Sequence, residues 1–220
     1  MVSPEQRVAI ETARGPVTGA WAEPKEAHAT LAVAPGAGGD LDTPFLVGFS
    51  REMNARGIAT LRFNFAYKEQ GRRSPDPEDT LRDAWNAAFA WAAEQRVGKV
   101  FAGGKSLGGR IAWMCVGDGM PAAGLVFLGY PLHAPGKPER LRDEHLYRIA
   151  VPMLFLQGTK DPFAKIDLLQ KVLKRLGKRA EFHAVEGGDH SFRVRGGSRD
   201  DRVIGAGLAE FAAPFIEERR

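Results

Sequence analysis

Short apolar runs alternate with amphipathic segments along most of this chain, and this alternation constrains its fold more than any other feature. Residues 8–12 and 17–22 predict an opening β-hairpin. Short buried strands are predicted over residues 31–34, 58–63, 100–102, 125–128, 153–156 and 181–185. Apolar side chains at helical spacing predict helices over residues 77–95, 163–176 and 200–218. Strands that alternate with helices form a mostly parallel sheet covered by helices on both faces.

The composition is that of an ordinary globular protein, with 44% hydrophobic and 26% charged residues, and we expect a single domain over residues 1–220. The one cysteine, Cys115, cannot form an internal disulfide. The net charge of +4 is spread along the chain instead of forming a stripe, which argues against a nucleic-acid partner. No run approaches the roughly 20 apolar residues that cross a bilayer, so we expect a cytoplasmic protein with no membrane span.

The run at 100–102 leads into the pattern Gly-x-Ser-x-Gly, formed by Gly104, Ser106 and Gly108. In this pattern the serine occupies a tight turn between a strand and a helix, and the flanking glycines avoid a collision there. The serine hydroxyl then projects into the cleft, and the amide of Leu107 lies at a helix N-terminus, where it can hydrogen-bond an oxyanion. Ser106 is therefore the candidate nucleophile.

A serine nucleophile needs a histidine base and an acid that orients the histidine. Asp161 follows the run at 153–156, and His190 follows the run at 181–185. In a parallel sheet these residues and Ser106 meet at the carboxyl edge, where such proteins bind their ligands. The order serine, aspartate, histidine is that of the α/β-hydrolase triad. The sequence therefore predicts Ser106, Asp161 and His190 as catalytic residues.

Several of these residues have other interpretations. The segment 104–106 resembles the end of a phosphate-binding P-loop, but Lys99 stands where that motif requires its first glycine. Asp161 precedes a proline and is also suited to start a turn or to cap a helix. Glu186 and Asp189 are nearer to the histidine in the chain, but neighbours in a tight loop usually point apart. We therefore prefer Asp161 as the acid.

The remaining loops at the same edge are expected to contact the substrate. The glycine-rich loop 34–40 follows the first parallel strand, and we nominate the Ala37 amide as the second oxyanion donor beside that of Leu107. A glycine-rich turn without function is the alternative. We assign four residues to substrate binding: Lys105, Tyr130, His133 and Arg72. His133 fits a plain loop position equally well.

Basic residues gather in the loops at this edge, namely Lys68, Arg72, Arg73, Lys105 and Lys160. They predict a positive rim that attracts acidic substrates, with an ordinary solvated surface as the alternative. Only 24 residues separate Leu128 from Met153, too few for a lid domain at this point of the chain. We therefore expect an open cleft.

These motifs resemble those of the α/β-hydrolases, and within that superfamily the chain is similar to the KANL/Tex-type group of compact α/β-hydrolases. The matching segments span nearly the whole chain: residues 35–40, 62–65 with 71–72, 104–110, 130–133 with 141–142, 158–163 and 187–192. The resemblance implies an eight-stranded sheet without a separate lid domain, with Ser106 as nucleophile, Asp161 as acid and His190 as base. Pro35 departs from the histidine that relatives often carry before this glycine-rich run.

We therefore expect a serine hydrolase that cleaves a small ester or thioester through an acyl-enzyme on Ser106. No histidine has metal-ligand spacing, and we expect neither a metal nor a cofactor. The expected partner is a small acyl substrate, and a homodimer is the one assembly that we consider. The main alternative is a non-catalytic α/β-hydrolase-like binding or scaffold protein, because some members of the group that the chain resembles are components of larger assemblies.

Overall fold

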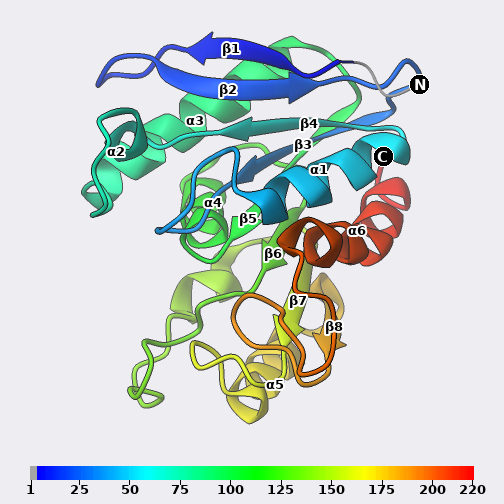
Figure 1. The fold of residues 1–220 in the computed structure, drawn as a ribbon. Helices are drawn as coiled ribbons and strands as arrows, with labels where there is room; N and C mark the ends of the chain where they lie inside the picture. The colour runs from blue at the N-terminus through cyan, green and yellow to red at the C-terminus, as the bar shows by residue number, and fades with distance from the viewer. Residues whose placement is uncertain (1–3) are drawn as a thin grey trace.

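An eight-stranded sheet forms the centre of the molecule in the computed structural model, which describes residues 4–220 (Figure 1). Its strand order is β1-β2-β4-β3-β5-β6-β7-β8. The strands are β1 (Gln6–Ile10), β2 (Val17–Ala22), β3 (Ala29–Ala34), β4 (Ile58–Phe63), β5 (Lys99–Lys105), β6 (Leu125–Leu128), β7 (Met153–Gly158) and β8 (Ala180–Val185). β2 pairs antiparallel with β1 and β4, and the other neighbours pair in parallel. The expected α/β-hydrolase fold with a mostly parallel sheet is confirmed.

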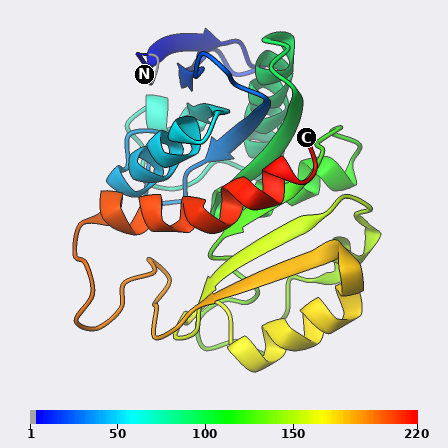
Figure 2. The same cartoon turned by 90° about the vertical axis from the view of Figure 1, so that its right-hand side faces the viewer.

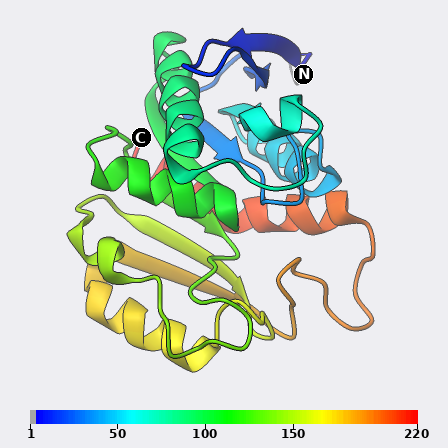
Figure 3. The same cartoon turned by 90° about the vertical axis from the view of Figure 1, so that its left-hand side faces the viewer.

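Helices cover both faces of this sheet (Figures 2 and 3). One face carries α1 (Pro44–Ala55) and α6 (Asp201–Glu217). The other carries α3 (Glu78–Glu94), α4 (Leu107–Gly117) and α5 (Ile166–Leu176). The short elements are α2 (Ala66–Glu69) and the 3₁₀ helices η1 (Glu144–Arg148) and η2 (Gly177–Arg179).

The sheet separates two hydrophobic cores. In β3, Leu31 and Val33 face the core with α1 and α6, whereas Ala32 and Ala34 face the core with α3 and α4. All four side chains are buried because successive residues of a strand point to opposite faces and both faces are covered. This burial on both sides explains why the strands are continuous apolar runs in the sequence.

Two glycines allow α1 and α6 to approach each other closely. A Cβ built on Gly48 would lie 2.0 Å from the carbonyl oxygen of Arg202, and one built on Gly205 would lie 2.0 Å from that of Phe45. A side chain at either position would collide with the backbone of the other helix. The pair of glycines therefore fixes the position of α6, whose N-terminal end lies beside the candidate site.

The helix α1 was not predicted, although its buried residues Phe45, Leu46, Phe49 and Met53 lie at helical spacing and pack in the core with α6. Gly48, a residue of low helix propensity, interrupts this pattern, and the close contact with α6 explains its presence. The helix α5 begins at Ile166 and not at residue 163, because the amide of Phe163 donates to the side chain of Asp161 in the preceding turn. The segment between β6 and β7 holds η1 and no lid domain. None of the helices within residues 4–220 combines the length and the hydropathy of a membrane-spanning segment.

Candidate active site

Ser106 lies in the turn between β5 and α4 with a strained backbone, at φ 49° and ψ −109°. A non-glycine residue rarely adopts a positive φ, and here the surrounding packing enforces it. A Cβ built on Gly104 would lie 2.7 Å from the carbonyl oxygen of Ala34, and one built on Gly108 would lie 2.4 Å from the same atom. The two glycines of the motif thus let β3 pack directly against the turn.

His190 connects Ser106 to Asp161. Its Nε2 lies 2.9 Å from Ser106 Oγ, and its Nδ1 lies 2.7 Å from Asp161 Oδ2. Because the carboxylate can only accept, Nδ1 carries the proton and Nε2 faces the hydroxyl as an acceptor. The imidazole also packs on the ring of Phe163, with the ring centroids 4.3 Å apart. The structure therefore brings the three predicted catalytic residues into one hydrogen-bonded chain.

The side chain of Asp161 is fully buried, whereas that of His190 is 21% exposed. Both oxygens of the carboxylate accept a hydrogen bond from a group other than the histidine. The amide of Phe163 donates to Oδ1 at 2.7 Å, and Nε2 of Gln157 donates to Oδ2 at 2.5 Å. These bonds offset the loss of hydration that a buried carboxylate suffers.

Gln157 is a residue of this site that the sequence reasoning missed. It is buried at the end of β7, and its Oε1 accepts a hydrogen bond of 2.7 Å from the amide of Tyr130. One side chain thus links the loop after β6 to the acid of the loop after β7. The signal in the sequence was a polar amide at the end of an otherwise apolar strand.

The two rival acids have other partners. Oδ1 of Asp189 accepts from the amides of Ser191 and Arg193, at 2.8 and 3.0 Å, and so shapes the loop that carries the histidine. Glu186 accepts from the hydroxyl of Thr159 at 3.2 Å. Neither carboxylate hydrogen-bonds to His190 in residues 4–220, and Asp161 does. The geometry thus favours Asp161 in the orienting position.

The glycine-rich loop after β3 lies against the serine turn. A Cβ built on Gly36 would lie 3.7 Å from Cβ of Ser106. The next residue, Ala37, is fixed through its carbonyl oxygen, which accepts a 2.9 Å hydrogen bond from the hydroxyl of Tyr67. Leu107 is the first residue of α4, a position whose amide has no partner within the helix. The two nominated oxyanion donors therefore belong to two backbone segments that both adjoin Ser106.

Two of the four residues assigned to substrate binding lie in the protein interior. Tyr130 is 1% exposed, packs against Phe127 and Phe155, and donates its hydroxyl to the carbonyl of Arg142. Burial raises the pKa of this phenol. The side chains around Tyr130 therefore give it a structural role.

His133 is also 1% exposed. Its Nε2 accepts from the amide of Lys165 at 2.9 Å, and its Nδ1 donates to the carbonyl of Ala134 at 2.9 Å. Its own amide donates to the carbonyl of Phe163. Nε2 of His133 thus ties its loop to the segment that follows Asp161, whereas Nδ1 bonds within its own loop.

The other two assigned residues lie nearer to solvent. Arg72 is exposed and forms an ion pair with Asp76, which in turn accepts from the amide of Tyr67. Lys105 stands at the end of β5 and lines a cavity of about 170 Å³ beside the glycine-rich loop. Of the four, Lys105 is the residue that the structure places in a cavity next to Ser106.

The structure bears on two alternatives, a phosphate-binding P-loop and a metal site. Gly103 and Gly104 belong to β5, so the chain before Lys105 is an extended strand and not a loop that could cradle phosphates. Within residues 4–220, no group of three or more His, Cys, Asp or Glu side chains is arranged to hold a metal ion.

Comparison with known proteins identifies the family. A family model described as an alpha/beta hydrolase domain matches residues 27–214. A lidless α/β serine hydrolase from Xanthomonas campestris is 17% identical, with a TM-score of 0.76 over 97% of this chain and 95% of that one. Dienelactone hydrolase from Anabaena variabilis is 18% identical, with a TM-score of 0.78 over 98% of each chain.

An esterase from Pyrococcus furiosus is 14% identical, with a TM-score of 0.76 over 98% of this chain and 91% of that one. At these identities the solved structures establish a common fold, and the family model extends the likeness to the sequence of residues 27–214. This chain belongs to the α/β-hydrolase domain family.

Proposed function

We propose that this protein is a serine hydrolase that cleaves a small ester or thioester through an acyl-enzyme on Ser106. The single observation that carries the proposal is the continuous chain of hydrogen bonds from Ser106 Oγ through His190, at 2.9 Å, to Asp161, at 2.7 Å. Both distances lie within the range that proton transfer requires. The strained backbone at Ser106 is a further support, because strain of this kind clusters at functional positions.

Acylation is the first step. As Ser106 Oγ attacks the carbonyl carbon, Nε2 of His190 takes the hydroxyl proton, and the Asp161 carboxylate stabilises the imidazolium that forms. The amides of Leu107 and Ala37 hold the negative oxygen of the tetrahedral intermediate. The imidazolium then gives its proton to the leaving alcohol or thiol, and the acyl group stays on Ser106.

Deacylation repeats these events with water as the nucleophile. Nε2 of His190 takes a proton from the water as the water attacks the acyl carbonyl, and the same two amides hold the oxyanion. Collapse of this intermediate returns the proton to Ser106 Oγ and releases the acid. We favour esters and thioesters over amides because an amide leaving group depends more strongly on proton delivery.

Within the α/β-hydrolases we place the chain in the KANL/Tex-type group. The segments that carry this resemblance include 104–110 and 187–192, which hold the serine turn and the histidine loop. Membership in that group leaves a non-catalytic role as the competing proposal, and an activity measurement separates the two.

The test is hydrolysis of 4-nitrophenyl esters of graded chain length, with thioesters assayed alongside. The wild type is expected to turn over at least one series. Ser106→Ala is expected to reduce turnover by about 10⁴-fold or more. Ser74→Ala, which changes an exposed serine, is the matched control. A wild type that hydrolyses none of these substrates, or a Ser106→Ala protein as active as the wild type, would support the binding-protein role instead.

A further inference from the structure

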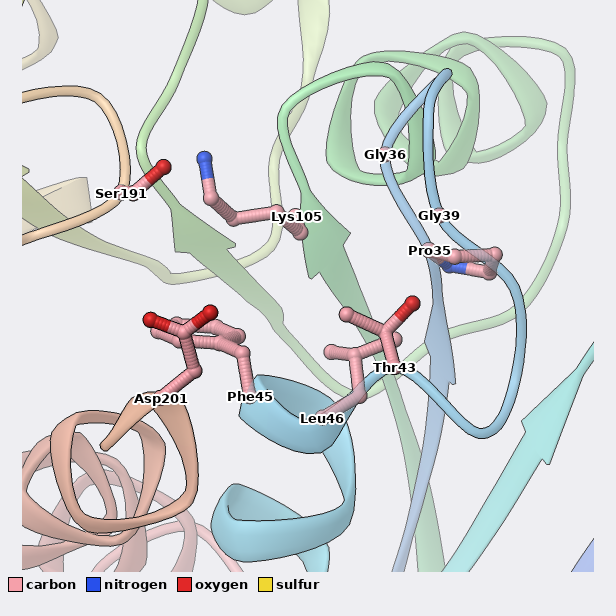
Figure 4. A pocket seen from close by; sticks show the side chains of 9 residues that line it. All are labelled: Pro35, Gly36, Gly39, Thr43, Phe45, Leu46, Lys105, Ser191 and Asp201. Carbon is pink, nitrogen blue, oxygen red and sulfur yellow. The ribbon is translucent and has the colours of Figure 1, made fainter. Parts of the chain in front are cut away.

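The side chain of Lys105 reaches from the end of β5 into the cavity beside the glycine-rich loop (Figure 4). The cavity is also lined by residues of four other segments: Pro35, Gly36 and Gly39 of the loop, Thr43, Phe45 and Leu46 at the start of α1, Ser191 of the loop after β8, and Asp201 at the start of α6. Gly36 connects this cavity to the serine turn, because a Cβ built on Gly36 would lie 3.7 Å from Cβ of Ser106. A molecule in this cavity would therefore lie close to Ser106.

The side chain of Lys105 is half-buried, and its ammonium has no carboxylate partner in the part of the chain that the structure describes. Among residues 4–220, no acidic oxygen lies within 4.0 Å of its Nζ. Nζ faces the ring of Phe192, 5.6 Å from its centroid, and the backbone of Gly129, where a built Cβ would lie 3.1 Å away. An ammonium that loses part of its hydration and gains no counter-ion is destabilised, and an anionic group of a ligand would stabilise it.

The charged groups around Lys105 leave the cavity open to an anion. Asp161 and Asp189 attract the ammonium from beyond ion-pair distance, and burial still lowers the pKa of Lys105 to about 8. Asp161 is engaged by His190, and Asp189 by backbone amides. Asp201 lines the cavity, but Arg193 holds it in a bidentate ion pair with bonds of 2.9 Å.

The other walls fit a short carbon chain. Pro35, Phe45 and Leu46 present apolar surface, and the Ser191 hydroxyl points toward the same end of the cavity as the Lys105 ammonium (Figure 4). A volume of about 170 Å³ is small beside the roughly 300–1,000 Å³ of drug-sized sites. The cavity therefore combines a small apolar channel with one positive and one neutral donor.

We propose that Lys105 selects substrates that carry a free carboxylate a few carbons from the scissile ester, with Lys105 Nζ and Ser191 Oγ as the donors to that carboxylate. This inference rests on the proposed function. Two classes of substrate carry such a carboxylate: monoesters of small dicarboxylic acids, and esters of small hydroxy acids. In both, the methylene or ring carbons contact the apolar wall while the carboxylate meets the ammonium.

The experiment compares pairs of substrates of similar size, one with a carboxylate and the other with a neutral carboxamide. One arm uses the mono-4-nitrophenyl esters of succinate, glutarate and adipate against the matching carboxamides, with spontaneous hydrolysis subtracted. The other uses the acetyl ester of 4-hydroxybenzoate against that of 4-hydroxybenzamide, with each kcat/KM divided by the rate constant for hydroxide-catalysed hydrolysis of the same ester, because the two phenols differ as leaving groups. In at least one arm kcat/KM is expected to favour the carboxylate by about 10- to 100-fold, as a charge-assisted hydrogen bond provides.

Two further measurements tie that preference to Lys105. Lys105→Met is expected to abolish the preference, whereas Lys160→Met, which removes an exposed lysine from the loop after β7, is expected to retain it. In the wild type the ratio of the two kcat/KM values is expected to fall as the pH rises through about 8, because the ammonium is charged below its pKa and neutral above it. The ratio cancels any pH dependence that the two substrates share, and the profile is measured on the wild type alone.

The outcomes separate the two proposals. One outcome is that kcat/KM is equal for carboxylate and carboxamide in both arms while hydrolysis still depends on Ser106. This outcome would overturn the role of Lys105 and would still support the proposed hydrolase activity. A preference that survives Lys105→Met would overturn the role of Lys105 as well. If no ester is turned over, protection of Ser106 from a fluorophosphonate by glutarate, but not by glutaramide, supports the carboxylate site, and equal protection by both overturns it.

Discussion

The side-chain amide of Gln157 donates to Oδ2 of Asp161 at 2.5 Å, and the same oxygen accepts from Nδ1 of His190. The Gln157 amide oxygen is in turn held by the backbone of Tyr130. The orientation of the acid therefore depends on β6 and β7 together and not on its own loop alone. Gln157 does not reach Ser106 and is a positioning residue.

Replacing Gln157 with methionine keeps the volume and removes both hydrogen bonds. We expect kcat to fall about tenfold with KM nearly unchanged, since a bond to a charged group contributes about 1.5–3 kcal/mol and substrate contacts are intact. Steady-state kinetics measures this split. Gln95→Met is the control, because the Gln95 amide bonds a carbonyl of its own helix. A rise in KM with kcat unchanged would contradict the positioning role.

The identity of the acid is tested by two matched substitutions. Asp161→Asn is expected to lower kcat by about 10⁴-fold, because an amide cannot stabilise the imidazolium and favours the wrong tautomer of His190. Asp189→Asn is expected to cost less than about tenfold, because the asparagine oxygen can still accept from the amides that Asp189 binds. If Asp189→Asn is the more damaging of the two, the assignment of the acid is wrong.

Tyr67 tests the glycine-rich loop, whose backbone donor cannot be removed by substitution. The hydroxyl of Tyr67 holds the carbonyl of Ala37 at 2.9 Å. Tyr67→Phe is expected to lower kcat about tenfold, less than the loss of a whole oxyanion donor, because the loop is loosened and not deleted. Tyr147→Phe removes a comparable hydroxyl, bonded to Asp143 at 2.6 Å, and is the control. Equal kcat in the two variants would argue against Ala37 as a donor.

The contact between α1 and α6 predicts opposite effects for two glycines of the same helix. Gly205→Ala places a methyl group 2.0 Å from the carbonyl of Phe45 and is expected to lower the free energy of unfolding by about 1–3 kcal/mol. Gly207→Ala meets open space and is expected to raise it by up to about 1 kcal/mol through helix propensity. Chemical denaturation of both variants measures the difference, and a stabilising Gly205→Ala would refute the close packing.

Residues with a periodic or motif signal were predictable from the sequence. The central strands β3, β4, β6 and β7 were predictable because they are buried on both faces, and the meeting of Ser106, His190 and Asp161 because each follows a strand of a parallel sheet. The helix α1 was missed because Gly48, which only the contact with α6 explains, interrupts its helical pattern. Tyr130 and His133 also follow a strand, but their neighbours turn them inward. Strand order alone cannot show the direction of a side chain, and tertiary packing decides it.

The most direct test of the central claim is the mass of the protein after treatment with a fluorophosphonate. The geometry around Ser106 predicts a single adduct, located on the peptide that contains Ser106, with labelling slowed by at least about 10³-fold in His190→Ala because the hydroxyl then lacks its base. An unlabelled wild type, or an adduct that forms equally fast without His190, would contradict the account.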